Sequence, residues 1–525
     1  MDSSQSQKTK TSLKTLVVSF WTFISRIFGV FRDIATTYIL GAGVAHDVFV
    51  VMLKIPNLFR RLVAEGAFSQ AFIPVFTEYK NNQSKEELKK LIDLTFTAIS
   101  SLVLLLCILF MIFAPIVVFI FAPGFYFDPA KKILAIEVLR ITFPYLFFVS
   151  LVAFFGAILN SFSFFSIPAA TPIAFNLSII IGAIFFTDYF QLPVLAIAWG
   201  VFAAGLIQFF INIIPILKLK LFPKLKLDFN HPGLKKISIL MLPGILSGGI
   251  IQINILIDTI FASLLITGSP TWLYLSDRLI QLPLGIFAIA AATVILPALS
   301  NAAALKNDFE FNEKFNWALK FIFIVGIPSS VGLYFLSSEI ISILFLRGEF
   351  STSDALMTSY SLKAFCFGLI AFMAIKILNV GFFARQDPKT PMYVALVSLI
   401  LNVFFNWLFA FKFGFGHIGL AIGSVIAAIV SFFILSFILI KRSILTLEGD
   451  SVIFLMKIII SSLGLFFGLL GFQTLFPNFS DWSLIVQIFN LLSIIFFGAF
   501  IYFGLMFVLG LRISFLILLS NTFNF

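Results

Sequence analysis

Residues 25–65 read SRIFGVFRDIATTYILGAGVAHDVFVVMLKIPNLFRRLVAE, an apolar stretch that could lie in a membrane. It nevertheless carries eight charged side chains: Arg26, Arg32, Asp33, Asp47, Lys54, Arg60, Arg61 and Glu65. One charged side chain at the centre of a bilayer costs roughly 2.5–3.5 kcal/mol, so several in two adjacent helices require partners or a water-filled cavity. Because five of the eight are basic, we interpret this stretch as the wall of a cavity that accepts an anion.

The composition of the whole chain is that of a polytopic, all-α membrane protein. Of 525 residues, 60% are hydrophobic and only 11% are charged. Apolar runs of about 20 residues or more predict membrane-spanning helices. We predict fourteen: 15–41, 44–76, 92–121, 133–160, 164–187, 193–217, 237–266, 270–300, 316–346, 355–383, 391–411, 417–440, 453–476 and 484–511.

The distribution of basic residues predicts the topology. If the N-terminus lies inside, the inside segments hold 20 Lys or Arg residues and the outside loops hold four. This asymmetry predicts cytoplasmic N- and C-termini. The net charge of +11 therefore reflects topology, and we expect no nucleic-acid partner.

A basic linker, residues 218–236, divides the chain. It separates an N-terminal lobe of six helices (1–217) from a C-terminal lobe of six (237–440), and the last two helices follow in 441–525. The linker carries six lysines. These lysines have two alternative explanations: they are an ordinary topology signal, or they contact anionic lipid headgroups.

Helical spacing brings the polar residues of the first two helices together. Ser25, Arg32 and Asp33 fall on one stripe of the first helix, and Asp47 and Glu65 lie along one face of the second. Charges within one helix can pair, as Arg61 and Glu65 can at a spacing of four. In contrast, Arg26, Arg32 and Arg60 have no obvious local acid of their own, so we expect them to line a functional cavity.

A weaker polar pattern appears in the second half. Asp258 and Arg278 would face the first arginines across a central cavity, or they would pair with each other between helices. Asn402 and Asn406 share a helical face. With Asp258 they could supply oxygen ligands for sodium, although hydrogen bonds between helices explain the two asparagines as well.

Several motifs together resemble one known family, the lipid II flippases (MurJ/MviN). The matching segments are Ser25–Asp33, Gly41–Gly43, Asp47, Lys54–Pro74, Phe143–Pro144, Asp277–Leu279, Pro297, Arg385–Asp387 and Lys389–Pro391. The resemblance implies the fold of the multidrug/oligosaccharidyl-lipid/polysaccharide exporter superfamily. In that fold two six-helix lobes form a V, and two C-terminal helices make a groove for a lipid tail.

The resemblance also implies a function: transfer of lipid II, the undecaprenyl-diphosphate-linked peptidoglycan precursor, to the outer leaflet. It places essential cavity arginines at Arg26, Arg32, Arg60 and Arg278, important acids at Asp33 and Asp47, and motif residues at Ser25 and Glu65. A sodium site of some members falls on Asp258, Asn402 and Asn406, where the last two are neutral amides. No other cofactor is implied. The expected partners are lipid II, membrane lipids and, as candidates, proteins of cell-wall synthesis.

Two rival functions differ in class from this one. One is transport of another substrate, either a different polyprenyl-diphosphate oligosaccharide or the cargo of a cation-coupled exporter of the same superfamily. The other is a membrane enzyme acting on the same lipid. An enzyme would need paired carboxylates or a histidine at the membrane surface, and the sequence offers no such arrangement. We therefore predict a transporter.

Overall fold

The chain folds as helices in a computed structural model that describes residues 2–62, 68–228, 230–446, 449–475 and 482–511. No strand occurs among these residues. By contacts the chain divides into two compact units. Unit 1 comprises Met1–Pro270 and the short loop Arg347–Phe350, and unit 2 comprises Thr271–Leu346 and Ser351–Phe525. The predicted lobes, with their boundary in the linker 218–236, stay a prediction.

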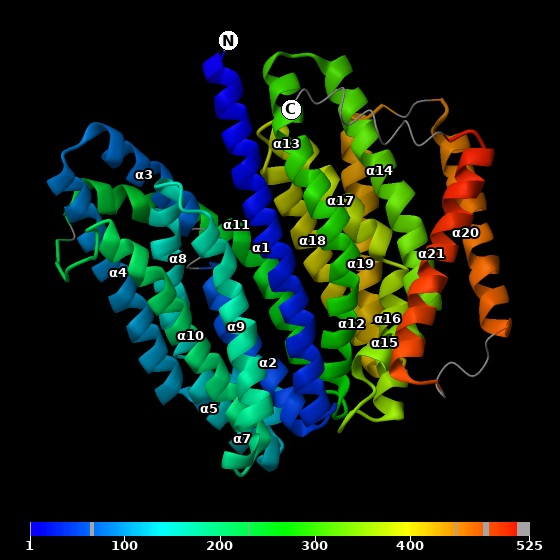
Figure 1. Cartoon of the computed structure of the whole chain (residues 1–525), viewed down its shortest axis with the longest axis horizontal. Coiled ribbons are helices and arrows are strands. Elements are labelled where there is room, and N and C mark those ends of the chain that lie inside the picture. Colours follow the sequence, from blue (N-terminus) through cyan, green and yellow to red (C-terminus); the bar gives the residue numbers. More distant parts are fainter. Residues whose placement is uncertain (1, 63–67, 229, 447–448, 476–481, 512–525) are drawn as a thin grey trace. The chain divides into compact units, whose positions relative to one another are not determined.

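Unit 1 contains long helices joined mostly by short turns (Figure 1). Its elements are α1 (Asp2–Leu40), α2 (Val44–Phe59), α3 (Phe68–Asn82), α4 (Lys85–Ile112), α5 (Ala114–Phe121), α6 (Pro123–Tyr126), α7 (Pro129–Thr142), α8 (Tyr145–Ser161), α9 (Ser166–Phe185), η2 (Thr187–Tyr189), α10 (Pro193–Lys218) and α11 (Pro232–Ser263).

Unit 2 is likewise helical, and two of its helices continue into π-helical turns, η3 and η4. Its elements are α12 (Ser269–Pro283, whose first two residues belong to unit 1), η3 (Leu284–Ala288), α13 (Ile289–Ala304), α14 (Asp308–Phe335), α15 (Ser337–Phe345), α16 (Thr352–Cys366), α17 (Leu369–Ala384), α18 (Lys389–Asn406), η4 (Trp407–Lys412), α19 (Gly416–Lys441), α20 (Ser451–Leu475) and α21 (Leu484–Val508).

The helices confirm the predicted class, an all-α polytopic membrane protein. Within the described ranges, ten helices are long and apolar enough to cross a membrane, and α16 with α17 forms an eleventh candidate bent by 45°. The count of fourteen spans stays a prediction. Within the predicted helix over 44–76, α2 runs to Phe59 and α3 begins at Phe68, and residues 63–67 between them lie outside the described residues.

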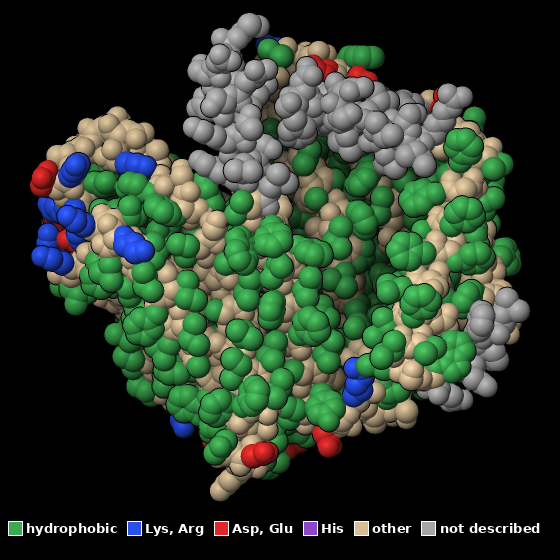
Figure 2. All heavy atoms as spheres, viewed as in Figure 1, with side chains coloured by type: hydrophobic (Ala, Val, Ile, Leu, Met, Phe, Trp, Pro, Cys, Tyr) green, Lys and Arg blue, Asp and Glu red, His purple; other side chains and the backbone are tan. Residues whose placement is uncertain are grey.

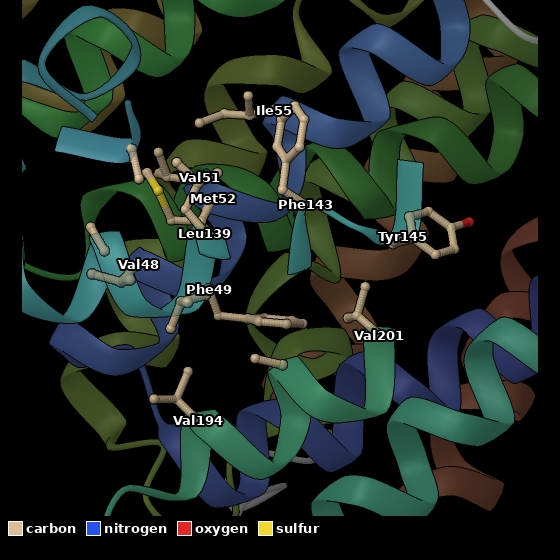
Figure 3. Close-up of a cluster of buried hydrophobic side chains, with 14 of the residues drawn as sticks. Val48, Phe49, Val51, Met52, Ile55, Leu139, Phe143, Tyr145, Val194 and Val201 are labelled. Carbon is tan, nitrogen blue, oxygen red and sulfur yellow. The ribbon is translucent and has the colours of Figure 1, made fainter. Parts of the chain in front are cut away.

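A hydrophobic core fixes α2 within unit 1. Val48, Val51 and Met52 of α2 are buried among side chains of α7 and α10 (Figure 3). Because apolar side chains recur at this helical spacing, one face of α2 turns toward this core. The packing thereby sets the positions of the polar residues at both ends of α2.

A second core joins α20 and α21 to α14 in unit 2. The hydroxyl of the buried Tyr502 on α21 donates a hydrogen bond to the carbonyl oxygen of Ile324 on α14 at 2.8 Å. Such a bond lets a tyrosine lie inside an apolar cluster without an unsatisfied polar atom. The two last helices are therefore packed onto unit 2 through α14.

Candidate anion-binding site

Arg32 lies buried on α1 and forms an ion pair with its neighbour. Its Nη2 lies 2.6 Å from Oδ1 of Asp33, and its Nε donates to the same oxygen at 3.1 Å. The expectation that Arg32 has no local acid is therefore wrong. Adjacent residues on a helix do not face each other, but the arginine side chain is long enough to reach back to the neighbouring carboxylate.

Asn176 of α9 fixes the other side of the Arg32 guanidinium. Its Oδ1 accepts a hydrogen bond from Nη1 of Arg32 at 3.2 Å, and its Nδ2 donates to the backbone carbonyl of Ser25 at 3.1 Å. The ring of Phe175 lies 5.8 Å from the guanidinium carbon, within the range of a cation–π interaction. The helices α1 and α9 run side by side (Figure 1), and this polar junction joins them.

Sequence reasoning did not include Asn176 among the site residues. The available signal was a single amide in an otherwise apolar helix, since such a group is costly to bury unless it is hydrogen-bonded. Its partner could not be identified from the sequence, because Ser25 and Arg32 lie about 150 residues earlier in the chain.

Asp47, near the start of α2, is fully buried and binds a backbone group. Its Oδ2 accepts a hydrogen bond from the N–H of Gly268 at 2.6 Å, just before α12 begins. Nearby, the N–H of Glu349 donates to the carbonyl of Tyr38 at 2.9 Å. The corner between α1 and α2 therefore holds two loops of unit 1, the one after α11 and the one at 347–350.

The remaining predicted residues of the first two helices are half-buried where the structure describes them. Arg60 lies at the end of α2, and its Nε donates to Oδ1 of Asn57 at 3.2 Å. Ser25 and Arg26 are half-buried on α1. Glu65 lies outside the described residues. Within unit 1, the junction thus brings together Ser25, Arg32 and Asp33, whereas Asp47 makes a separate contact.

The candidate sodium ligands belong to both units. Asn402 and Asn406 lie on α18 in unit 2, whereas Asp258 lies half-buried on α11 in unit 1. Asn406 donates to Oδ1 of Asn402 at 2.9 Å, and Asn402 donates to Oγ of Ser424 on α19 at 3.0 Å. The bond from Asn402 to Ser424 joins α18 to α19, as the alternative of hydrogen bonds between helices expects, whereas the bond from Asn406 to Asn402 lies within α18. The described residues contain no group of three or more His, Cys, Asp or Glu that could hold a metal, and sodium binding stays a prediction.

Arg278 lies half-buried on α12 in unit 2. Its neighbour Asp277 is exposed and accepts a long hydrogen bond, 3.4 Å, from Gln281 one turn later. Because Asp258 belongs to the other unit, the predicted pairing of Asp258 with Arg278 stays untested.

The fold of the chain is shared with a solved transporter structure. The chain is similar to an inward-facing multidrug resistance MATE family transporter of the MOP superfamily, with a TM-score of 0.67 and 14% identity, over 82% of this chain and 98% of that one. At this identity the likeness shows the fold alone.

Nearer relatives identify the family. A solved structure described as lipid II flippase MurJ in an inward closed conformation aligns with a TM-score of 0.79 and 29% identity, over 94% of this chain and 98% of that one. A probable lipid II flippase MurJ of Haemophilus influenzae is 36% identical over 507 residues, or 94% of this chain and 98% of the relative. The profile of the family described as lipid II flippase MurJ matches residues 36–492. The chain belongs to this family, and the resemblance found in the sequence motifs is confirmed.

Proposed function

We propose that this protein moves lipid II from the cytoplasmic to the outer leaflet of the bacterial inner membrane by alternating access. The observation that carries the proposal is the family match over residues 36–492, which extends across both units. The division of the chain into two compact units supports a mechanism in which one moves against the other. We also propose that both termini are cytoplasmic.

In this proposal, the diphosphate of the substrate is bound by Arg26, Arg32, Arg60 and Arg278. An arginine presents a planar fork of donors that matches phosphate oxygens, and this pairing is stronger than that of a neutral donor. The buried Arg32 is already oriented by Asp33 and Asn176. An incoming diphosphate would compete with Asp33 for the guanidinium, so Asp33 acts as the counter-ion that the substrate replaces.

The other predicted residues have supporting roles in the proposal. Asp47 holds the corner of α1 and α2 through its bond to Gly268, and Ser25 and Glu65 contribute to substrate binding. The helices α20 and α21 provide the apolar surface for the lipid tail. The return step is driven either by membrane potential or by sodium bound at Asp258, Asn402 and Asn406. Membrane potential suffices in size, because moving one charge through 100 mV is worth about 2.3 kcal/mol. Proteins of cell-wall synthesis are the candidate partners.

Binding to the purified full-length protein tests the substrate. We would measure retention of lipid II, undecaprenyl monophosphate and a different undecaprenyl-diphosphate oligosaccharide by native mass spectrometry. The proposal expects lipid II to be retained most strongly and Arg60→Ala to weaken its retention. Equal retention of both diphosphate lipids would instead favour the rival with another oligosaccharide, and equal retention of the monophosphate would contradict diphosphate recognition.

A further inference from the structure

The linker between α10 and α11 is fastened along α4 by its backbone. The N–H of Lys224 donates to Oδ1 of Asp93 at 2.9 Å, and the N–H of Lys226 donates to Oγ1 of Thr97 at 3.0 Å. N–H groups two residues apart point the same way in an extended chain, so both face α4. We call residues 222–227 the linker strap.

Ion pairs strengthen this attachment. The carboxylate of Asp93 is buried, and it pairs with Lys89 on α4 and with Nζ of Lys226 at 3.3 Å. Beyond the strap, Nζ of Lys90 lies 3.5 Å from Oδ2 of Asp228. Because a buried carboxylate is costly unless it is paired and hydrogen-bonded, these contacts keep the strap at one place on α4.

The linker strap contacts α4 at the point where the sequence of that helix changes from polar to apolar. Asp93 and Thr97 follow the first helical residue, Lys85, by eight and twelve positions. At a rise of 1.5 Å per residue this is roughly 12–18 Å along the helix. The residues before Leu91 are mostly polar, and the candidate membrane span continues to Ile112. The strap therefore lies where α4 enters the bilayer.

The strap and the residues just before it carry exposed apolar and basic side chains. Leu225 and Leu227 are 75% and 72% exposed. Lys218, Lys220 and Lys224 are also exposed and make no ion pair with any residue that the structure describes. Figure 2 shows Lys and Arg side chains gathered at this end of unit 1. Exposed leucines beside unpaired lysines are typical of a segment at a membrane interface.

We propose that the linker strap, together with Lys218 and Lys220 just before it, is a docking site for anionic phospholipids of the adjacent leaflet, separate from the transported lipid. Leu225 and Leu227 enter the boundary between headgroups and acyl chains, while Lys218, Lys220 and Lys224 bind headgroup phosphates. The bilayer is the partner because the strap lies beside a spanning helix at the depth where that helix becomes apolar. Each basic residue near an anionic surface changes partition by roughly fivefold, and salt weakens the attraction.

Two measurements on the full-length protein test this site. First, a nitroxide on Leu227→Cys reports the depth of the strap in nanodiscs, and the native Cys107 and Cys366 are buried away from the label. In nanodiscs containing phosphatidylglycerol, the label is expected to be more accessible to oxygen than to a water-soluble nickel chelate. In phosphatidylcholine alone, the preference should be weaker.

Second, native mass spectrometry counts retained phosphatidylglycerol. The triple variant K218Q/K220Q/K224Q should retain at least fivefold less than the wild type, whereas K218R/K220R/K224R keeps the charges and should retain the wild-type amount. A label equally accessible to nickel in both nanodiscs would place the strap in water or under a protein and overturn the proposal. Unchanged retention in the glutamine variant, or equal loss in both triple variants, would overturn it as well.

Discussion

Asn176 accepts a hydrogen bond from Arg32 at 3.2 Å, although the two residues lie 144 positions apart in the chain. The same amide donates to the backbone of Ser25, so one side chain of α9 contacts α1 at two points. With Asp33 on its other side, the Arg32 guanidinium has a defined direction within unit 1. An arginine held in this way is preorganised for an anion, since less side-chain freedom is lost on binding.

Replacement of Asn176 by Ala should destabilise unit 1. The change leaves Nη1 of the buried Arg32 without this acceptor, and an unsatisfied buried polar group costs about 1–3 kcal/mol. We expect a lower midpoint of thermal denaturation for the purified protein. The control is Asn82→Ala on the exposed end of α3, which should change stability by less than about 0.5 kcal/mol. Equal midpoints for the two variants would show that the junction contributes nothing to stability.

Asp47→Ala should be more harmful than Asp47→Asn. Alanine removes the acceptor of the Gly268 N–H at a fully buried position, at a cost of about 1–3 kcal/mol. Asparagine keeps an oxygen of similar size that can still accept this bond. The midpoint of thermal denaturation should therefore fall more for alanine, while Asp188→Asn at an exposed site should have no effect. A larger loss for asparagine than for alanine would argue against the hydrogen bond as the cause.

Gly348→Ala should loosen the loop 347–350 from the corner of α1 and α2. Gly348 has φ +60°, and an added Cβ would overlap the carbonyl oxygen of Tyr38. Gly414 is the matched control, because its φ is +73° but its Cβ would meet no atom within 4 Å. Both variants carry the backbone strain of about 1–2 kcal/mol, and only Gly348→Ala adds the clash. Limited proteolysis within 347–350 should be faster in Gly348→Ala alone; similar rates in both would contradict the close approach.

The turn between α17 and α18 should contribute stability that is lost in acid. Burial alone would raise the pKa of the Asp387 carboxyl, but hydrogen bonds from Thr390 and Arg442 outweigh it and lower the pKa from 3.8 to about 2. Because the folded-state pKa lies below the unfolded value, the contribution is present above about pH 4 and is lost as the pH falls through about 2. The difference in thermal midpoint between wild type and Asp387→Asn should shrink over this range. If the difference in thermal midpoint did not depend on pH, the ion pair between Asp387 and Arg442, whose atoms lie 2.6 Å apart, would be excluded as its source.

The sequence predicted the helical membrane class because long apolar runs have few alternatives in a bilayer. It did not predict where those runs are interrupted. The π-helical turns η3 and η4 consist mostly of apolar residues, as the helices around them do. The hydropathy pattern therefore does not distinguish these turns from α-helix. The bend between α16 and α17 lies at Gly368, where an added Cβ would come within 2.7 Å of the Val425 side chain on α19.

For the candidate site, the motif residues of α1 and α2 could be chosen from the sequence, but their partners could not. Periodicity places Arg32 and Asp33 on one stripe, yet it does not say that they pair with each other. The acceptor on α9 and the backbone partner of Asp47 depend on tertiary contacts. These are the contacts that a hydrophobic pattern leaves undetermined.

The most direct test of the central claim is lipid II exposure at the outer leaflet of cells depleted of this protein and of any other flippase. The cells would be complemented with wild type, Arg32→Ala or Arg140→Ala; Arg140 lies exposed on α7, outside the candidate site. We expect wild type and Arg140→Ala to restore exposure, and Arg32→Ala to leave lipid II in the inner leaflet despite normal membrane levels. Restoration by Arg32→Ala would contradict the arginine site, and failure of wild type to restore exposure would contradict the proposed function itself.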